Sequence, residues 1–340
     1  MIVVDGAAGE GGGQVLRTAL SLALVTGQSF RIERIRARRA RPGLLRQHLA
    51  AVQAAQWLGR AEVTGASLGA ATLEFAPARI AAADHRIDIG SAGSTTLVAQ
   101  TLIPALVCAD RPVQIAIAGG THNPQAPPVE FLERAFVPLL RRMGAQLDVT
   151  LVRAGYFPRG GGELTLAVTP VARLRALDLP GRGALAAASC DVRLARLPRH
   201  IAEREIATVA ATLGVDDLRT QIVEDRASVG AGNVVLVTLA CEHVTDVFAA
   251  FGERGVPAER VAREAAAAAA GWFGADVAVG PYLADQLLLP LALAGRGSFT
   301  TTAPSGHTRT NAALIEQFLP VRIDLRALGG GRFHVSLAPT

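Results

Sequence analysis

The sequence contains no lysine, because all 34 of its basic residues are arginine. A lysine nucleophile, a lysine Schiff base and a phosphate-binding loop of the Walker type each need a lysine amine, so this absence excludes three enzyme classes. Arginine suits bidentate recognition of phosphate, but a GC-rich genome is the simpler source of most of these residues.

Aromatic residues make up only 4% of the chain, and long apolar runs are missing. Proteins that bind single-stranded nucleic acid stack bases on aromatic rings, and this chain has few rings to offer. We therefore expect any contact with nucleic acid to depend mainly on charge. The apolar run at residues 20–25 is too short to span a bilayer, and Asp5 interrupts the N-terminal one. We therefore expect neither a membrane helix nor an export signal.

The three cysteines, Cys108, Cys190 and Cys241, are odd in number and scattered. Their spacing fits neither a disulfide framework nor a zinc site, and it favours a reducing cytoplasm. Apolar residues, by contrast, form 50% of the 340 residues. That content is enough to bury a sizeable core in one large domain or two ordinary ones.

A strand-like segment, a glycine-rich loop and an apolar helix recur along the chain. In the first copy, a strand at residues 1–4 precedes the loop 9–14 and a helix with Leu16, Leu20 and Leu24 on one face. The second copy has a strand at 87–89 and a helix at 95–108, and the third has a helix at 282–294 and a strand at 297–299. Each copy continues with a polar loop and another helix, which predicts repeated β-α-β-α-β units.

The spacing of the repeats indicates an insertion. The turn after the first helix recurs about 83 residues later, and then only roughly 185 residues after that. The second interval is about 100 residues longer than the first, and these additional residues begin near Pro180-Gly181-Arg182-Gly183. They include an amphipathic helix within 197–213, a buried strand at 234–239 and a helical alanine run at 265–270. We therefore expect an α/β fold of the α+β type, with a large three-repeat domain at 1–179 and 277–340 and a smaller inserted α/β domain at 180–276.

The first glycine-rich loop is Gly9-Glu10-Gly11-Gly12-Gly13-Gln14. It lacks the lysine of a Walker loop and the last glycine of a dinucleotide fingerprint, so a generic phosphate cradle and a flexible turn both remain open. On the helix that follows, Gln14, Arg17 and Ser21 are spaced to share one face, with Glu10 at its mouth.

The densest charge lies between residues 31 and 46, where seven arginines are accompanied by one acid, Glu33. Charged residues usually form a solvated face, but cations this crowded repel one another unless a polyanion or buried partners neutralise them. We therefore favour contact with a phosphate backbone. The seven are Arg31, Arg34, Arg36, Arg38, Arg39, Arg41 and Arg46.

His307 lies in the polar segment 305–311, just ahead of an apolar helix pattern. Free N–H groups and the helix dipole favour an anion there, although a lone histidine in a polar loop is more often solvated than catalytic. If the loops of the three repeats converge, they assemble a carboxylate, arginines, amides and a histidine, which suits phosphoryl or nucleotidyl transfer. This set is Glu10, Arg17, the arginine cluster, Gln100, Asp285, Gln286 and His307.

The other histidines are weaker candidates. His122 competes with His307, but Pro124 and the Pro127-Pro128 pair beside it favour a rigid turn. We interpret the remaining five as structural, namely His48, His85, His200, His243 and His334.

Five motifs resemble the RNA 3'-terminal phosphate cyclase family, and the resemblance extends over nearly the whole chain, including the insertion. They are the loop at 9–14, Arg41-Pro42-Gly43-Leu44-Leu45-Arg46-Gln47-His48, Gly90-Ser91-Ala92-Gly93-Ser94, Pro198-Arg199-His200-Ile201-Ala202-Glu203-Arg204-Glu205 and Tyr282-Leu283-Ala284-Asp285-Gln286. The resemblance implies that His307 attacks the α-phosphate of ATP and becomes a covalent histidyl-AMP. The AMP then passes to an RNA 3'-phosphate, which closes to a 2',3'-cyclic phosphate and expels AMP.

The same resemblance implies roles for other residues. Glu10 is the implied ligand of a divalent metal, Mg or Mn, and Asp285 is implied to orient His307. Arg17, Arg39 and Gln47 match positions that engage phosphates or RNA. The implied ATP pocket is lined by Gln100, Pro127, Tyr282, Leu283, Ala284, Asp285 and Gln286, with Tyr282 and Pro127 as walls for adenine. Helix capping by Asp285 and simple exposure of Gln47 remain open as alternatives.

The sequence departs from the family pattern at two positions. Ala154 stands before Gly155 in a signature segment where arginine or histidine is usual, which puts one minor contact in doubt. Arg38 replaces a smaller residue and adds a cation to the expected RNA path.

Two rival functions are considered. A non-catalytic, cyclase-like RNA-binding assembly factor would lack the histidine that is present here as His307, and carboxyvinyl transferases typically rely on lysines, which this chain lacks. We therefore expect an enzyme with ATP and RNA 3'-phosphate ends as substrates and no membrane partner, and a homodimer is left open.

Overall fold

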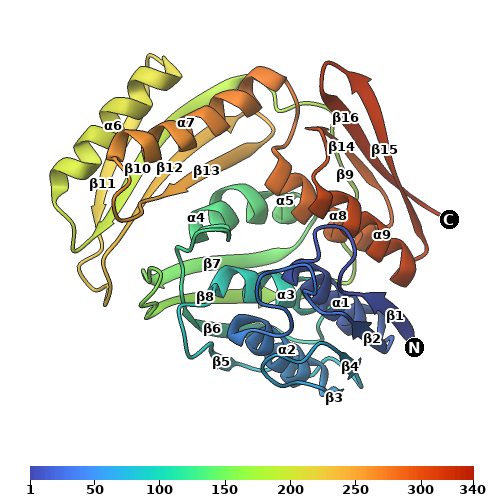
Figure 1. Cartoon of the computed structure of the whole chain (residues 1–340). Helices are drawn as coiled ribbons and strands as arrows, with labels where there is room; N and C mark the ends of the chain where they lie inside the picture. Colours follow the sequence, from blue (N-terminus) through green and yellow to red (C-terminus); the bar gives the residue numbers. More distant parts are fainter.

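Three parts of the chain fold with one strand order, and a fourth part forms a sheet of its own (Figure 1). The computed structural model describes residues 1–340. In the first unit the sheet order is β1-β2-β4-β3, with β1 and β2 parallel and the other neighbours antiparallel. Its elements are β1 (Ile2–Asp5), α1 (Gly13–Thr26), β2 (Phe30–Glu33), α2 (Arg46–Gly59), β3 (Glu62–Thr64) and β4 (Leu73–Ala76).

The second unit repeats this order as β5-β6-β8-β7. Its second helix is composite, because a π-helical segment, η1, lies between two short α-helices. The elements are β5 (His85–Asp88), α3 (Thr95–Val107), β6 (Val113–Gly119), α4 (Val129–Phe131), η1 (Leu132–Phe136), α5 (Val137–Arg142), β7 (Gln146–Arg153) and β8 (Gly162–Thr169).

The third unit has the order β9-β14-β16-β15, again with the first pair parallel. Its first helix, α8, comes only after the inserted segment, so β9 is far from its partner in sequence. The elements are β9 (Leu177–Leu179), α8 (Pro281–Ala294), β14 (Gly297–Thr302), α9 (Gly306–Phe318), β15 (Val321–Gly329) and β16 (Arg332–Pro339).

The inserted segment forms the sheet β11-β10-β12-β13 and carries two long helices, α6 and α7. Figure 1 shows it beside α4 of the second unit, and β13 contacts α4 and η1. Its elements are β10 (Leu185–Ala195), α6 (Arg199–Leu213), β11 (Leu218–Glu224), β12 (Gly232–Cys241), β13 (Thr245–Phe251) and α7 (Ala258–Ala275).

The predicted α/β class with repeated units is confirmed, and each unit has one more strand than predicted. Every unit ends in two antiparallel strands, so the repeat is β-α-β-α-β-β. The extra strand of the first unit, β3, has only three residues and a mostly exposed pattern, which is too short to show the alternation that identifies strands.

One continuous apolar core contains 96 buried residues and extends through all three units and the insertion. The division into 1–179 with 277–340 and 180–276 is therefore our proposal rather than a visible gap, and the separate sheet of β10 to β13 supports it. No helix combines the length and the apolar character needed to cross a membrane.

Helix α1 joins the three units, because it packs against α2 of its own unit, α3 of the second and α9 of the third. Its buried face is formed almost entirely of leucine, alanine and valine, and the left-handed Gly27 ends it. Helix α9 also packs against α8. The N-terminal end of α1, with its glycine-rich loop, therefore lies next to the N-terminal end of α9.

Candidate active site

His307 lies in the first turn of α9, whereas the sequence suggested a loop residue ahead of the helix. Ser305 causes the difference, since its Oγ accepts the Thr308 N–H at 3.1 Å and starts the helix at Gly306. The side chain of His307 is 38% exposed, and its Nε2 lies 2.9 Å from Oε2 of Glu10. The imidazole therefore sits where free N–H groups and the helix dipole favour an anion.

The glycine-rich loop lets three elements meet at this point. A Cβ on Gly306 would lie 2.8 Å from the Glu10 side chain, and one on Gly12 would lie 3.0 Å from Nη2 of Arg39. A side chain on Gly9, which has a φ of +57°, would overlap Oγ1 of Thr310. These glycines are thus required for close approach, which argues against the alternative of a merely flexible turn.

Asp285 on α8 joins α8 to both α1 and α9. Its carboxylate accepts hydrogen bonds from Nε2 of Gln14 and, at 2.6 Å, from Nδ2 of Asn311. Thr18 on α1 donates to Oδ1 of Asn311 at 2.8 Å. Burial raises the pKa of Asp285, and the hydrogen bond from Gln14 is the largest opposing effect.

No hydrogen bond joins Asp285 to His307. The carboxylate contacts Asn311, one helical turn after the histidine on the same face of α9, and the charge of His307 also acts on it by lowering its pKa. The acid beside the ring is Glu10 instead. Asn311 was not singled out from the sequence, although its spacing of four from His307 within the polar segment was a usable signal.

Arg17 lies one turn further along α1, against His48. Burial lowers the pKa of Arg17 to about 10, while the negative charge of Asp285 opposes this shift. Burial also lowers the pKa of His48 to about 3, with contributions from Arg17 and Arg36. His48 is therefore uncharged. Its Nδ1 accepts the Leu45 N–H at 3.1 Å, and its Nε2 lies against Gly13.

His48 was interpreted from the sequence as structural, and its hydrogen bond to the α2 N-terminus agrees with that role. Its position beside Arg17, however, makes it part of the wall of the site. The available signal was its place at the end of the motif at residues 41–48. Gln47 next to it accepts the Ser94 N–H at 3.4 Å, which connects this wall to the glycine-rich loop of the second unit.

The arginine cluster divides into paired and unpaired members. Arg31 binds Glu33 and Glu74, and Arg34 binds Asp5 at 2.5 Å. Glu33 is thus not the only balancing acid, because Asp5 and Glu74 approach from other strands. Arg36 donates instead to the carbonyl oxygens of Arg41 and Gly43.

The remaining arginines of the cluster lie nearer the site. Arg39 is 3.7 Å from Oε2 of Glu10, and Arg38 donates to the Gly9 carbonyl at 3.0 Å. Arg41 and Arg46 are exposed and form no ion pair. Arg38, Arg41 and Arg46 therefore form no ion pair, and Arg39 has only the long one with Glu10.

Two of the residues expected to line the nucleotide pocket each have a buried polar atom without a partner, namely Nε2 of Gln100 and Oε1 of Gln286. Buried polar groups are normally hydrogen-bonded, so these two are available to a bound molecule. Gln100 lies on α3, which Ser21 ties to α1 by donating to the Thr101 carbonyl at 2.8 Å. Gln286 follows Asp285 on α8, which is held to α1 by Gln14.

The other expected pocket residues are more varied in exposure. Tyr282 is 71% exposed, whereas Leu283 and Ala284 are buried in the core. The Pro127 carbonyl accepts a hydrogen bond from Thr96 Oγ1 at 2.7 Å, which fixes that loop against α3. Tyr282 therefore offers a free ring, and Leu283 and Ala284 support the helix that carries it.

His122 is buried and belongs to a separate charge network. Its Nε2 lies 3.0 Å from Oε2 of Glu130, and Thr121 bonds its Nδ1 at 2.9 Å. Arg193 of the insertion binds Glu130 at 3.2 Å and Asp225 at 2.6 Å. Burial tends to raise the pKa of Glu130, but His122 and Arg193 outweigh it and lower the value to about 2. These contacts fully explain His122 as a structural residue.

No group of three or more His, Cys, Asp or Glu side chains is placed to hold a metal ion. Glu10 is a single carboxylate at the mouth of the site, with one oxygen facing His307 and Arg39. Mg²⁺ is commonly held by one or two carboxylates together with water and substrate phosphates. The residues therefore fit a metal that arrives with a nucleotide, and they do not fit an all-protein cage.

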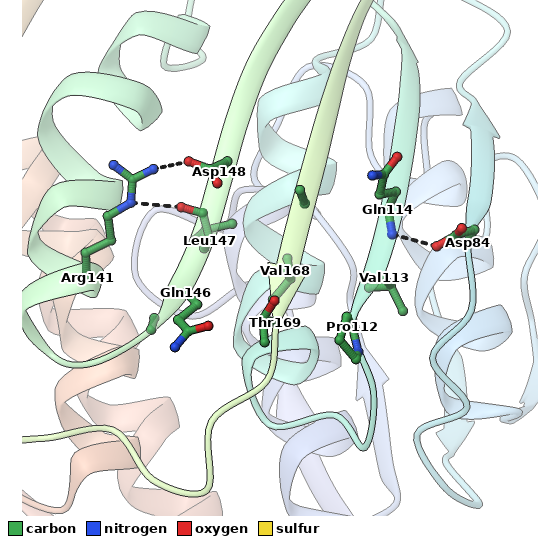
Figure 2. Close-up of a pocket in the computed structure, with 12 residues that line it drawn as sticks. Asp84, Pro112, Val113, Gln114, Arg141, Gln146, Leu147, Asp148, Val168 and Thr169 are labelled. Carbon is green, nitrogen blue, oxygen red and sulfur yellow. Dashed lines mark hydrogen bonds and ion pairs between the residues drawn. The ribbon is translucent and has the colours of Figure 1, made fainter.

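A cavity of about 770 Å³ lies elsewhere, at the end of the second sheet where β6 and β7 start and β8 finishes (Figure 2). Figure 2 shows Arg141 reaching Asp148 and the Leu147 carbonyl on one side, and the Gln114 backbone donating to Asp84 on the other. It is at the start of β6, whereas the loop with His122 follows the end of β6. None of the expected site residues lines it.

Comparison with known proteins gives a consistent result. The family model described as RNA 3'-terminal phosphate cyclase matches residues 8–325. Three curated relatives, each named RNA 3'-terminal phosphate cyclase, are similar over nearly their whole length. The one from Koribacter versatilis is 50% identical over 96% of this chain and 92% of its own. Those from Ralstonia nicotianae and Ectopseudomonas mendocina are 52% and 50% identical, over 96% and 95% of this chain and 94% of theirs.

Proposed function

The chain belongs to the RNA 3'-terminal phosphate cyclase family, and from this premise we propose that it cyclises RNA 3'-phosphate ends through a covalent histidyl-AMP on His307. It is thus an enzyme of the cyclase type, with ATP and RNA as its substrates. The observation that carries the proposal is the placement of His307 at the start of α9, 2.9 Å from a Glu10 carboxylate that Arg39 also approaches at 3.7 Å.

In the first step, a ring nitrogen of neutral His307 attacks the α-phosphorus of ATP. The N–P bond forms as the bond from this phosphorus to the bridging oxygen breaks, and pyrophosphate leaves with its electron pair. Arg17 and Arg39 are placed to balance the charge of the phosphates, and the N-terminus of α9 adds a positive dipole. Asp285 holds α8 against α1 through Gln14 and against α9 through Asn311 while this happens.

Glu10 is the residue that would hold a divalent metal, Mg or Mn, together with the phosphates and water. When bound there, the ion would neutralise developing charge on phosphate oxygens. Glu10 lies against Nε2 of His307 in the free protein. A carboxylate in that position keeps the imidazole oriented until the nucleotide arrives.

In the second step, an oxygen of the RNA 3'-phosphate attacks the phosphorus of the histidyl-AMP, which breaks the N–P bond and frees His307. The product carries AMP on the RNA 3'-phosphate. The neighbouring 2'-hydroxyl then attacks that 3'-phosphorus, loses its proton, and expels AMP to give the 2',3'-cyclic phosphate. Arg39, Arg38 and the free arginines Arg41 and Arg46 supply the cations that this second anionic substrate needs.

We place adenine between Tyr282 and the loop of Pro127, with Gln100 and Gln286 as polar contacts. Their unpaired buried atoms support this placement, because a purine or ribose would satisfy them. The three cysteines form no disulfide, which supports placing this chemistry in the cytoplasm.

A non-catalytic RNA-binding role is the main alternative. It predicts a site that binds anions without a nucleophile, yet His307 is present and partly exposed between an acid and arginines. Binding of RNA without any transfer of label from ATP to the protein would favour this alternative.

The experiment is incubation with α-labelled ATP and Mg²⁺ or Mn²⁺, followed by denaturation. We expect label on the protein that is lost in acid and kept in base, as a phosphoramidate requires. His307→Asn should abolish it. His200→Asn is a matched control, because His200 is also the second residue of a helix, α6, but has no acid or arginine partner for its ring. Absence of label on the wild type would refute nucleotidyl transfer, and label on His307→Asn would refute only the nucleophile.

A further inference from the structure

An exposed aromatic ring is rare in this molecule, and one of the few is at the turn between β7 and β8. Phe157 is 63% exposed. The other two exposed aromatic residues are Tyr282 and Phe273. Tyr282 belongs to the segment 282–286 that we propose to bind the nucleotide, and the Arg182 guanidinium lies 4.5 Å over the ring of Phe273. Phe157 has no aromatic or cationic partner within the chain.

The turn that carries Phe157 is firmly held. Its neighbour Tyr156 is buried, and the Tyr156 hydroxyl donates to Asp225 at 2.5 Å. The Gly160 N–H donates to the Tyr156 carbonyl at 2.7 Å, and Arg153 donates to the Gly161 carbonyl at 2.6 Å. One ring therefore anchors the turn inside while the next is presented to solvent, so its exposure is not the result of a loose segment.

A free cation accompanies the ring. Arg159 is exposed and forms no ion pair or hydrogen bond, while its aliphatic stem packs 2.8 Å from the Cβ position of Gly230 in the insertion. Val229, 54% exposed, packs against Gly161 on the same side. The surface formed by Phe157, Arg159 and Val229, called here the hairpin tip, combines an apolar ring with an unneutralised guanidinium.

The hairpin tip is connected to the active site through successive contacts. The Cβ position of Gly160 lies 2.8 Å from Ala92 of the second glycine-rich loop, and that of Gly93 lies 2.9 Å from Gln47. Gln47 precedes His48, which abuts Gly13 at the start of α1. These contacts place the hairpin tip beside the second glycine-rich loop, which in turn lies against Gln47.

We propose that the hairpin tip binds the single-stranded RNA upstream of its 3' end, with a base stacked on Phe157 and a phosphate at Arg159. Stacking on an aromatic ring together with charge on the backbone is how single-stranded nucleic acids are held without sequence preference. The proposal rests on the proposed function, since it takes the RNA end to lie at His307. It adds one aromatic contact to the binding by charge that the sequence led us to expect.

The test compares two RNAs with 3'-phosphates, a dinucleotide and a ten-nucleotide strand that carries 2-aminopurine at successive positions. We expect Phe157→Ala to weaken binding of the longer RNA by about 5- to 100-fold and to leave the dinucleotide unaffected. In the wild type, one 2-aminopurine position should be quenched, and Phe157→Ala should lose this quenching while Phe157→Trp keeps it. Phe273→Ala on α7 is the matched control for removal of an exposed ring.

A second variant keeps the test independent of the ring. Arg159→Gln should reduce the slope of log affinity against log salt by about 0.7 for the longer RNA. Equal losses on both RNAs, or an unchanged affinity for the longer one, would overturn the proposal, and the latter would leave the tip as a surface for a protein partner. These binding measurements omit ATP, so they are separate from the labelling of His307, which both variants should retain.

Discussion

Asp246 gives the sharpest prediction about the free energy of unfolding. It lies on β13 of the insertion and is 2% exposed. Its two oxygens accept the N–H of Gly280, which caps α8, and that of Val247, each at 2.9 Å. Burial raises its pKa from 3.8 to about 7, although these two backbone hydrogen bonds act in the opposite direction.

The sign and size follow from linkage. A carboxyl whose pKa is higher in the folded protein binds its proton more tightly there, so its contribution to stability is present at low pH and is lost as the pH rises through the folded value. A shift of about 3 units corresponds to ~4 kcal/mol, lost at ~1.4 kcal/mol per pH unit between the two pKa values. The wild type should therefore become less stable from pH 5 to pH 8.

The perturbation is Asp246→Asn, measured by urea denaturation at pH 5, 6, 7 and 8. The amide has one acceptor oxygen for two N–H groups, so we expect the variant to be less stable than wild type at pH 5 by about 1–3 kcal/mol. The difference should shrink or reverse by pH 8, because the variant has no charge to bury. Glu205, whose pKa burial raises to about 7, contributes a separate slope, and Glu205→Gln serves as the parallel control.

Equal pH dependence in the wild type and Asp246→Asn would refute the reasoning, since it would mean that this carboxyl titrates alike in the folded and unfolded chain. A functional readout accompanies the stability measurement. Asp246 holds the cap of α8, the helix that carries Asp285 and the nucleotide segment. Loss of this contact should raise the concentration of ATP needed for labelling more than it lowers the final extent of labelling.

Two further predictions concern the first unit. Gly9→Ala should slow labelling of His307 at least tenfold, because the new methyl group overlaps Thr310 and the φ of +57° is strained for alanine. Gly27 is also left-handed but has open space around it, so Gly27→Ala is the control for backbone strain alone. Similar labelling rates in both variants would contradict a steric cause. Arg39→Gln should flatten the salt dependence of RNA binding by about 0.7 in slope, whereas Arg31→Gln should leave it unchanged because Glu33 and Glu74 already neutralise that side chain. Titration of a short RNA at several salt concentrations compares the two variants. An equal change of slope in both would mean that the arginine cluster is a solvated face and not an RNA contact.

Much of the architecture was predictable because it repeats. Apolar periodicity and recurring glycine-rich loops predicted the repeated units, and the irregular spacing predicted an insertion, whose bounds stay our proposal. The alanine run at 265–270 was also correctly predicted as helix, within α7. These features depend on local patterns, which the chain displays directly.

Features that depend on partners from distant segments were less accessible. The arginines at 31 and 34 are neutralised by Glu74 and Asp5, which approach from neighbouring strands, so local charge counting overstated the free cations. The resemblance implied that Asp285 orients His307; its hydrogen bonds go to Gln14 and Asn311, and the contact of Glu10 with the ring could not be predicted from the sequence.

The split third sheet has a consequence for synthesis of the chain on the ribosome. Asp178 on β9 accepts a hydrogen bond from Ser298 on β14 across 120 residues. At about 5–20 residues per second, β9 waits roughly 6–24 s for this partner to be made. The first two sheets, with the arginines at their edge, can settle during that interval, while the insertion is still being translated. The segment that contains His307 is translated after the insertion, so a nascent chain gains its arginine-rich face before the residue that we propose as the nucleophile.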